Sequence, residues 1–586
     1  MAIANVTAPT QPTSPTWNWR GELSLVGSVL RSVPPYLLAI LALIAITLAY
    51  QVGDRASVRV GGGYDEPSVQ GFYEREVSND GATRFRWATD RARVLLPGAG
   101  ARPSTLVITA GPRPDGVARP VQVVVNGLPL ASFTPQAGLR DYTFPLRPEQ
   151  YSYGDLTVDL LSDPQLVPGK GNNRLPYGPQ ITGVRAVADA DAGFVKPPYR
   201  PLLAWLIIAP PLYFLLRRLG VGMAVASGVV LGGVALGAWA ITLERLDLTL
   251  FAPRVAFLLV LAYLLLVGTD LIVPRLFARG GVTIAPREWR LLQLIVLAVL
   301  GLKLGGLLYP QLFVIDQPWH NQNFEKVLNG RFLEIYRPAA GGISELPGQW
   351  GIQGQIPYPP FLYVFGLPFY LWPLGRDLSI NLWSGLLDCA RPLLIFYLAR
   401  RLGASPRAGI IAAFVMGLTA ATFLLHSWGN YPTTVSQWTA LLFLVLLVAR
   451  FKDLRRPWVF VGLLALLTVT MLLYTVPAVF IGLLLVILIA ALAWRGGPAE
   501  RRQLLPLGGL LVGASAIAFA SYYVQFVGPL LTETLPAFGS GLSQGEALGI
   551  ARDPFPLYAW KYVNRLAYYG VLISILLAPL GIWTLL

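Results

Sequence analysis

The sequence predicts a polytopic α-helical membrane protein with about 12 transmembrane helices and an antiparallel β-sandwich inserted between the first and second of them. The composition excludes an ordinary soluble protein. Hydrophobic residues make up 54% of the 586 residues, charged residues only 13%, and the mean hydropathy is +0.55. Soluble domains carry roughly a quarter charged residues. Apolar runs of about 20 residues, the length that crosses a bilayer as a helix, also recur along the chain.

The chain begins with a segment that we place in the cytoplasm, residues 1–33, which is rich in Pro and Thr. The first predicted transmembrane helix follows at 34–52. It begins after some thirty residues and lacks a small-residue cleavage site, so we interpret it as an anchor and not as a cleavable signal. Its polar flank leads directly into a stretch of different composition.

Residues 53–198 form the predicted β-sandwich. Charges of both signs are nearly balanced there, and short β-rich runs such as Ser104–Ala110 and Leu156–Leu161 alternate with turn signals. One run, Val121–Val125, directly precedes the turn dipeptide Asn126-Gly127. Strands this short, without helical periodicity, favour an antiparallel sandwich. Because apolar segments flank the domain on both sides, we expect it to lie outside the cytoplasm.

The apolar blocks return at 199–288, where three transmembrane helices are expected, and continue through 289–586. The short apolar piece 359–374 is interpreted as non-spanning, since Pro368 and Pro373 interrupt it and its omission keeps the later basic clusters inside. Both ends of the chain are then cytoplasmic in a plasma (inner) membrane. The sandwich and two long loops, 310–377 and 524–563, share the outer face. The chain stops at Leu586 inside an apolar run, so we expect the natural protein to continue.

The net charge of +15 is not a nucleic-acid signal. The excess basic residues form short clusters at the ends of the apolar blocks, such as Arg217-Arg218, Arg400-Arg401 and Arg501-Arg502. This is the positive-inside pattern of membrane proteins. The single cysteine, Cys389, lies within an apolar block, so no disulfide framework is expected.

The loop 310–377 holds the main candidate for chemistry, Asp316, where an apolar block reaches the outer surface. His320, one of only two histidines, follows four residues later on a predicted short helix that ends at Gly330. An acid and a neutral-range base half out of water can activate a hydroxyl group, and partial burial would raise the pKa of the acid. Taken alone, Asp316 also fits a solvated aspartate at the membrane interface.

The order of elements resembles the GT-C superfamily of membrane glycosyltransferases, most closely the protein O-mannosyltransferase and aminoarabinose-transferase branch. The resemblance rests on Asp316 at the end of an apolar block, a short helix, Tyr358-Pro359-Pro360, and then a span that reads NLWSGLLDCARPLLIFYLARRLG. It implies a polyprenyl-phosphate sugar donor, inversion at the anomeric carbon, Asp316 as general base and Tyr358 in the substrate site. Two positions depart from the family pattern, Gln317 after the aspartate and Asn381 at the start of the span.

Other polar residues in apolar surroundings are candidates for substrate contacts. Asp388 and Arg391 lie three residues apart within one apolar block, where they form either an internal ion pair or a groove for the donor phosphate. His426, in HSWGNYP, either caps a helix C-terminus or contacts a lipid-linked phosphate with the help of Asn430. Lys303 either belongs to the same set or extends its amine to the interface. No dense carboxylate set occurs, so no cofactor is expected, and a divalent metal is less favoured than metal-independent chemistry.

The predicted sandwich resembles jelly-roll modules of the galactose-binding type, a fold that binds sugars in some proteins and only scaffolds in others. Trp87, in the alternating run Arg84-Phe85-Arg86-Trp87, fits a core residue better than a sugar platform. The partners implied are a polyprenyl-phosphate sugar, a lipid, glycan or protein acceptor, membrane lipids and subunits of a membrane complex. The competing function is a non-catalytic scaffold or glycan-binding subunit with a degenerate GT-C fold. A transporter is weaker, because no inverted repeat is evident.

Overall fold

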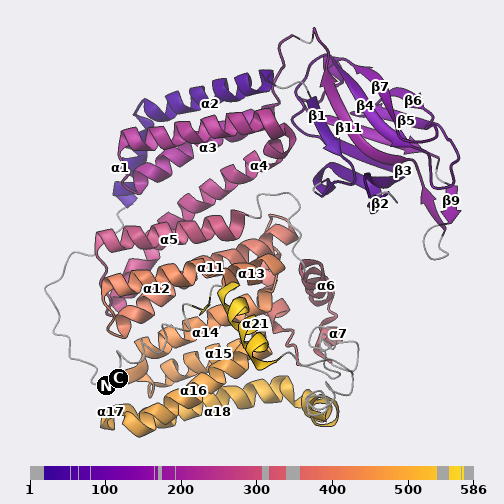
Figure 1. The fold of residues 1–586 in the computed structure, drawn as a ribbon. Coiled ribbons are helices and arrows are strands. Elements are labelled where there is room, and N and C mark those ends of the chain that lie inside the picture. The colour runs from indigo at the N-terminus through magenta and orange to yellow at the C-terminus, as the bar shows by residue number, and fades with distance from the viewer. Residues whose placement is uncertain are drawn as a thin grey trace. The chain divides into compact units, whose positions relative to one another are not determined.

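The computed structural model describes residues 19–52, 55–63, 65–78, 81–163, 165–168, 174–191, 193–305, 316–337, 357–536, 554–568 and 571–572. They divide into two compact units, which lie within 17–265 and within 266–306 and 313–586. Figure 1 labels the helices and strands of both units. The predicted combination of an N-terminal β domain with a helical region containing several apolar helices is confirmed.

The β domain occupies the middle of the first unit. Nine of its described strands form one sheet, in the order β6-β5-β8-β3-β11-β4-β7, with β1 on β11 and β2 on β3, while β9 and β10 form a separate hairpin. Every pairing is antiparallel, as the sequence predicts. The strands are β1 (Arg55–Arg59), β2 (Val69–Val77), β3 (Arg84–Leu96), β4 (Ser104–Gly111), β5 (Val121–Val125), β6 (Leu128–Phe133), β7 (Arg140–Leu146), β8 (Leu156–Ser162), β9 (Gln165–Pro168), β10 (Arg174–Tyr177) and β11 (Gln180–Ala188).

The sheet curls until its two end strands meet, so that one face of the sheet encloses the core. The strands at the two ends of the order, β6 and β7, meet through the rings of Phe133 and Tyr142, whose centroids are 4.3 Å apart. Alternating residues of β5 point inward, since Val121, Val123 and Val125 are buried and Gln122 is exposed. This period-two burial is what the sequence pattern indicates.

Two arginines of β3, Arg86 and Arg93, form ion pairs that hold the domain together. The guanidinium of Arg86 donates from Nε and Nη2 to both carboxylate oxygens of Asp65, each at 2.8 Å, and both side chains are almost fully buried. Arg93 on β3 pairs with Asp159 on β8, with Nε and Oδ1 2.6 Å apart. Trp87 is half-buried and packs edge-on against Phe85, with centroids 5.2 Å apart. The half-buried position agrees with a packing role for Trp87.

The helices of the first unit flank the β domain in sequence. They are α1 (Trp19–Leu30), α2 (Pro34–Gln51), α3 (Tyr199–Arg218) and α4 (Met223–Arg279), the last of which continues into the second unit. The α4 helix has 57 residues and a break at Glu244, where φ is −137° and ψ is 63°. We predict two spans there with a loop between them. The non-helical residue Glu244 divides α4 into two helices that meet at a kink, and the residues after the kink are helical instead of forming a loop.

The second unit is helical. Its longer helices are α5 (Pro286–Gly305), α6 (Gln317–Leu328), α11 (Arg376–Arg401), α12 (Pro406–Leu418), α13 (Ala420–Trp428), α14 (Tyr431–Ala449), α15 (Pro457–Leu473), α16 (Thr475–Arg495), α18 (Leu504–Ser521) and α21 (Phe555–Tyr568). Shorter turns of helix are α7 (Phe332–Tyr336), α9 (Phe361–Phe365), α10 (Leu367–Tyr370), α17 (Pro498–Arg501) and α19 (Val527–Pro529). The piece 359–374, predicted not to span, is divided into α9 and α10, which are too short to cross a bilayer.

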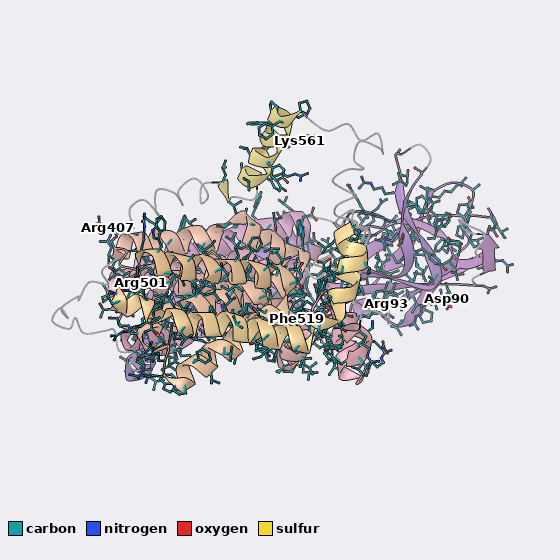
Figure 2. All side chains as sticks on the ribbon, turned by 90° about the horizontal axis from the view of Figure 1, so that it is seen from below. Asp90, Arg93, Arg407, Arg501, Phe519 and Lys561 are labelled. Carbon is teal, nitrogen blue, oxygen red and sulfur yellow. The ribbon has the colours of Figure 1, made fainter. Side chains whose placement is uncertain are left out.

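Eight helices within the described residues are long and apolar enough to cross a membrane, judged by length and composition. Two further helices fall just outside that class: α15 has 17 residues, and α5 contains Lys303 and three more charges in its first turns. The predicted number of 12 spans and their placement in a membrane stay predictions, since the block 564–586 lies largely outside the described residues. Figure 2 shows Arg407 and Arg501 at one end of the helices of this unit and Phe519 at the other.

Candidate active site

Asp316 directly precedes α6 and occupies the position that usually caps a helix. Its backbone N–H donates to the carbonyl of Trp428 over 2.9 Å, which ties the start of α6 to the end of α13. Its side chain does not cap the helix. Among the described residues, the carboxylate also has no ion-pair partner. The side chain is half-buried, and burial raises the pKa of Asp316 above its ordinary value.

Tyrosine side chains surround this carboxyl group. Tyr358 and Tyr363 are buried, and the charge of Asp316 adds to burial, the main cause, in raising the pKa of both phenols. Trp319 packs edge-on against Tyr358 with centroids 5.4 Å apart, and Tyr358 packs on Tyr474 at 5.3 Å. These phenols stay protonated at neutral pH, so they offer O–H donors and ring surface near Asp316 without adding charge.

His320 lies one turn into α6 and is only 1% exposed. Its Nδ1 and the hydroxyl of Tyr363 are 2.8 Å apart, and its ring packs against Tyr431 with centroids 5.1 Å apart. Burial lowers the pKa of His320 to about 3. His320 is therefore neutral at pH 7, and it cannot offer a positive charge to a phosphate.

A buried hydrogen-bond chain fixes the first turn of α6 against the bundle. The amide nitrogen of Asn381 on α11 donates to Oε1 of Gln317 at 2.9 Å, and the hydroxyl of Tyr431 on α14 donates to Oδ1 of Asn381 at 2.8 Å. Gln317 is the residue after Asp316, so this chain holds the backbone that carries the acid. The two departures from the family pattern, Gln317 and Asn381, thus contact each other, a relation that the sequence alone did not reveal.

A second group of charges lies inside the helices, where Asp388 sits between two cations. The amine of Lys303 on α5 is 3.1 Å from Asp388 Oδ2, and Nε of Arg391 is 3.0 Å from Asp388 Oδ1. All three side chains are 2% or 3% exposed. Arg391 also donates from Nη2 to the carbonyl of Thr434 on α14 at 2.7 Å. The predicted ion pair of Asp388 with Arg391 is confirmed, and Lys303 joins it instead of reaching toward an interface.

His426 and Asn430 lie on either side of the turn between α13 and α14. His426 is buried, its Nδ1 is 3.5 Å from the hydroxyl of Ser384, and its Nε2 has no hydrogen-bond partner among the described residues. Asn430 caps α14 by accepting from the Thr433 N–H at 3.3 Å, a role that was not predicted for it. Gly429 between them has φ of 75°, which allows the tight turn.

The structure gathers the predicted site residues into two neighbouring groups. Asp316, His320 and Tyr358 form the first, and Asp388, Arg391 and His426 form the second. The α13–α14 turn, with Asn430, touches both. Their assignment to substrate binding stays a prediction. The sequence did not predict the hydrogen bonds of Gln317, Tyr363 and Asn381 in the site. Its only indication was that these polar residues lie beside apolar segments.

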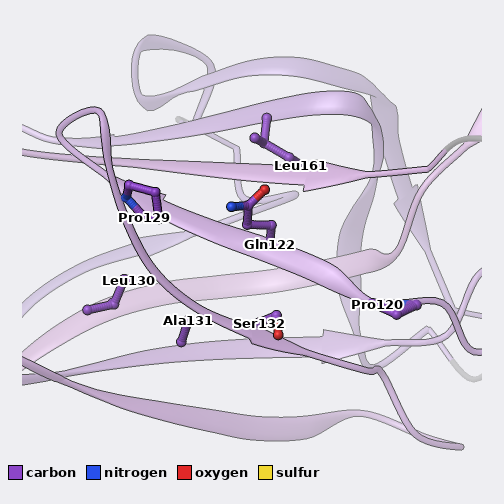
Figure 3. A pocket seen from close by; sticks show the side chains of 7 residues that line it. All are labelled: Pro120, Gln122, Pro129, Leu130, Ala131, Ser132 and Leu161. Carbon is purple, nitrogen blue, oxygen red and sulfur yellow. The ribbon is translucent and has the colours of Figure 1, made fainter.

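No group of three or more His, Cys, Asp or Glu side chains that could hold a metal ion occurs in the described part of the chain. The β domain carries a shallow hollow of about 490 Å³ over β5, β6 and β8 (Figure 3). Gln122, Ser132 and Leu161 stand opposite one another on these three strands. The lining has no aromatic ring and only two polar side chains, so it lacks the usual features of a specific small-molecule site. It is lined by Pro120, Gln122, Pro129, Leu130, Ala131, Ser132 and Leu161.

Comparison with known proteins does not assign the chain to a family. No protein-family model matches it, and neither does any curated protein. Among solved structures, a family 35 carbohydrate binding module from Clostridium thermocellum is 11% identical over 100% of its length and 23% of this chain, with a TM-score of 0.17. A family 35 carbohydrate binding module from an environmental isolate is 18% identical over 95% of its length and 23% of this chain, with a TM-score of 0.15. Likeness at these scores identifies neither a ligand nor an activity.

Proposed function

We propose that the protein is a membrane glycosyltransferase that moves a sugar from a polyprenyl-phosphate donor to an acceptor on the outer face of the membrane, with inversion. The state of Asp316 carries this proposal. An aspartate before a helix ordinarily caps it, yet this carboxylate neither caps α6 nor pairs with a cation of the described chain. It is half-buried with a raised pKa, which are the properties of a general base.

The reaction then follows from the chemistry of the groups. Asp316 takes the proton of the acceptor hydroxyl, and the oxygen attacks the anomeric carbon from the face opposite the phosphate. The bond between that carbon and the phosphate oxygen breaks, and its electron pair leaves with the polyprenyl phosphate. Inversion follows because attack and departure occur on opposite faces. Tyr358, Tyr363 and His320 supply neutral rings and donors that orient the sugar.

Membrane placement is part of the proposal, and the geometry of α11 supports it. Asn381 lies near the start of α11 and is linked through Gln317 to the acid, whereas Arg400 and Arg401 lie at its end. The intervening 20 or so residues span about 30 Å, the thickness of a hydrocarbon core. Basic residues mark the cytoplasmic side. Asp316 is then at the outer side of a plasma membrane, where a polyprenyl-linked sugar presents its head group.

The second group of charges suits the donor phosphate. Lys303 and Arg391 together carry two positive charges against the one negative charge of Asp388, so the cluster has a surplus that an anion would balance. His426, with a buried Nε2 that lacks a hydrogen-bond partner in the described chain, lies beside it. We propose that these side chains bind the donor phosphate when the helices admit it. The acceptor is a lipid, glycan or protein, and no nucleic acid is involved.

The test replaces Asp316 by Asn and by Glu in membranes that contain the full chain. Transfer is followed from a panel of radiolabelled polyprenyl-phosphate hexoses and pentoses. Asp377→Asn is the matched control, because Asp377 is an exposed acid on the neighbouring first turn of α11. We expect D316N to lose transfer by 100-fold or more, as for removal of a general base (about 10²–10⁴), and D377N to keep it.

D316E should retain part of the activity, with a changed pH profile. Size-exclusion profiles of the purified variants establish that each is folded. Transfer by D316N at the level of the parent would refute the assigned role. A folded chain that transfers no sugar from any donor of the panel would favour the competing description, a non-catalytic membrane subunit.

A further inference from the structure

The helix α21 is rich in aromatic residues and also carries two basic ones. Its sequence is FPLYAWKYVNRLAY, with Lys561 and Arg565 as its charged residues. Large apolar side chains on it are strongly exposed: Phe555 by 81%, Trp560 by 64% and Val563 by 42%. A helix that keeps such rings in water loses the free energy that their burial would give. An environment outside the described fold therefore covers them.

The residues of α21 divide into two faces. At 100° per residue, Phe555, Tyr562, Val563 and Leu566 fall on one side of the helix, with Trp560 at its edge. Lys561, Asn564 and Tyr568 fall on the opposite side together with Leu557, and Arg565 lies at the boundary next to Tyr562. Figure 2 draws Lys561 on this helix. Separation of apolar and basic residues at this period is the pattern of a helix that lies at an interface between water and lipid.

The position of α21 in the chain selects the lipid surface over a protein partner. On one side, α18 is among the helices long enough to cross a membrane and ends at Ser521. On the other side, residues 569–586, YGVLISILLAPLGIWTLL, contain no charged residue and follow α21 directly. The segment between Ser521 and residue 569 is thus attached to apolar segments at both of its ends. Trp and Tyr are also the residues enriched at bilayer boundaries.

We propose that α21 lies in the plane of the membrane on the surface of the phospholipid bilayer. Phe555, Val563 and Leu566 enter the boundary between headgroups and acyl chains, with Trp560 at the headgroup level. Lys561 and Arg565 point to water and to the headgroup phosphates. This inference needs the membrane placement proposed above, but it does not depend on sugar transfer. It assigns a lipid-binding surface to a segment predicted as the end of the outer loop 524–563 and the start of the last apolar block, 564–586.

The experiment uses the full chain in phosphatidylcholine and phosphatidylglycerol nanodiscs. The native Cys389 is 1% exposed, so the parent chain serves as the labelling blank, and a C389A background replaces it where the parent takes up label. Single cysteines are placed at Phe555, Val563 and Leu566 on one face and at Lys561, Asn564 and Arg565 on the other. Each is spin-labelled, and its collision rates with oxygen, which concentrates in lipid, and with a water-soluble nickel chelate are measured.

We expect the two faces to differ by several-fold in the ratio of these collision rates, oxygen dominating at Phe555, Val563 and Leu566 and nickel at the other three. Three outcomes would overturn the proposal. Nickel dominating everywhere means that the helix lies in water. Both collision rates being low on the apolar face means that protein covers it. Oxygen dominating at all six positions means that α21 is the start of a membrane-crossing helix.

Discussion

Replacement of Asp388 by Asn removes the one negative charge between Lys303 and Arg391. Both cations are about 3 Å from it, at 3.1 and 3.0 Å, and none of the three side chains is more than 3% exposed. With an effective dielectric constant of about 20, each attraction at that distance amounts to roughly 5 kcal/mol. Desolvation of the carboxylate offsets several kcal/mol of this sum. We therefore expect D388N to lose about 3–5 kcal/mol of stability, the range for breaking a buried ion pair.

Lys303→Met provides the decisive comparison. It leaves Asp388 with Arg391, a neutral pair at 3.0 Å, so we expect a loss of only about 1 kcal/mol. Asp453→Asn is the control, since its pairs with Arg450 and Arg456 are partly exposed and are worth about 0–1 kcal/mol. The assay heats the full chain in detergent and measures the monodisperse fraction that survives. If D388N proves as stable as K303M, the three charges do not form the coupled group described here.

Three further predictions concern other buried contacts. Because the pKa of His320 is about 3 when folded and 6.5 when unfolded, the unfolded chain binds the extra proton between these values. Stability is then full above about pH 6.5 and falls by roughly 1.4 kcal/mol per pH unit below it, and H320Q should flatten the dependence of melting temperature on pH. N381L strands Gln317 and the Tyr431 hydroxyl and should cost about 1–3 kcal/mol, measured by the same heating assay. Asp65→Asn leaves the buried Arg86 with Glu66, an exposed carboxylate 3.7 Å away, as its only ion-pair partner in the described chain. The change should lower the denaturant midpoint of the β domain by the equivalent of about 3 kcal/mol, whereas an unchanged midpoint would mean that Glu66 compensates the charge of Arg86.

Much of the fold could be predicted from local sequence patterns, because buried residues recur at a fixed spacing along a strand or a helix. In β5, buried Val residues alternate with Gln122, and the same alternation across the domain predicts strands. Long uncharged runs predict helices such as α16 and α18 equally well. The kink that joins the two helices of α4 at Glu244, in place of a loop, was not readable. Charges between two apolar blocks look the same to composition whether the backbone turns there or merely kinks.

The candidate site was readable only in part, because its contacts join distant segments. Asp316 and His320 were found from their place beside an apolar block, and α6 ends at Leu328 just before Gly330, whose φ of 71° suits a helix end. The burial of His320 was not predicted, since it depends on contacts with Tyr363 and Tyr431, which lie far along the chain. Burial makes His320 a neutral hydrogen-bonding residue and leaves Asp316 as the group that suits a base.

The placement of Lys303 has a physical reason that sequence reasoning could have used. A charge inside an apolar segment is stable only when an opposite charge meets it. Asp388 and Arg391 satisfy each other by spacing alone, which leaves Lys303 without a local partner and favours the interpretation that it reaches the interface. The structure shows instead that one carboxylate serves both cations, at 3.1 and 3.0 Å. Two cations around one carboxylate are costly for a purely structural role, which supports the proposal that these helices bind an anion.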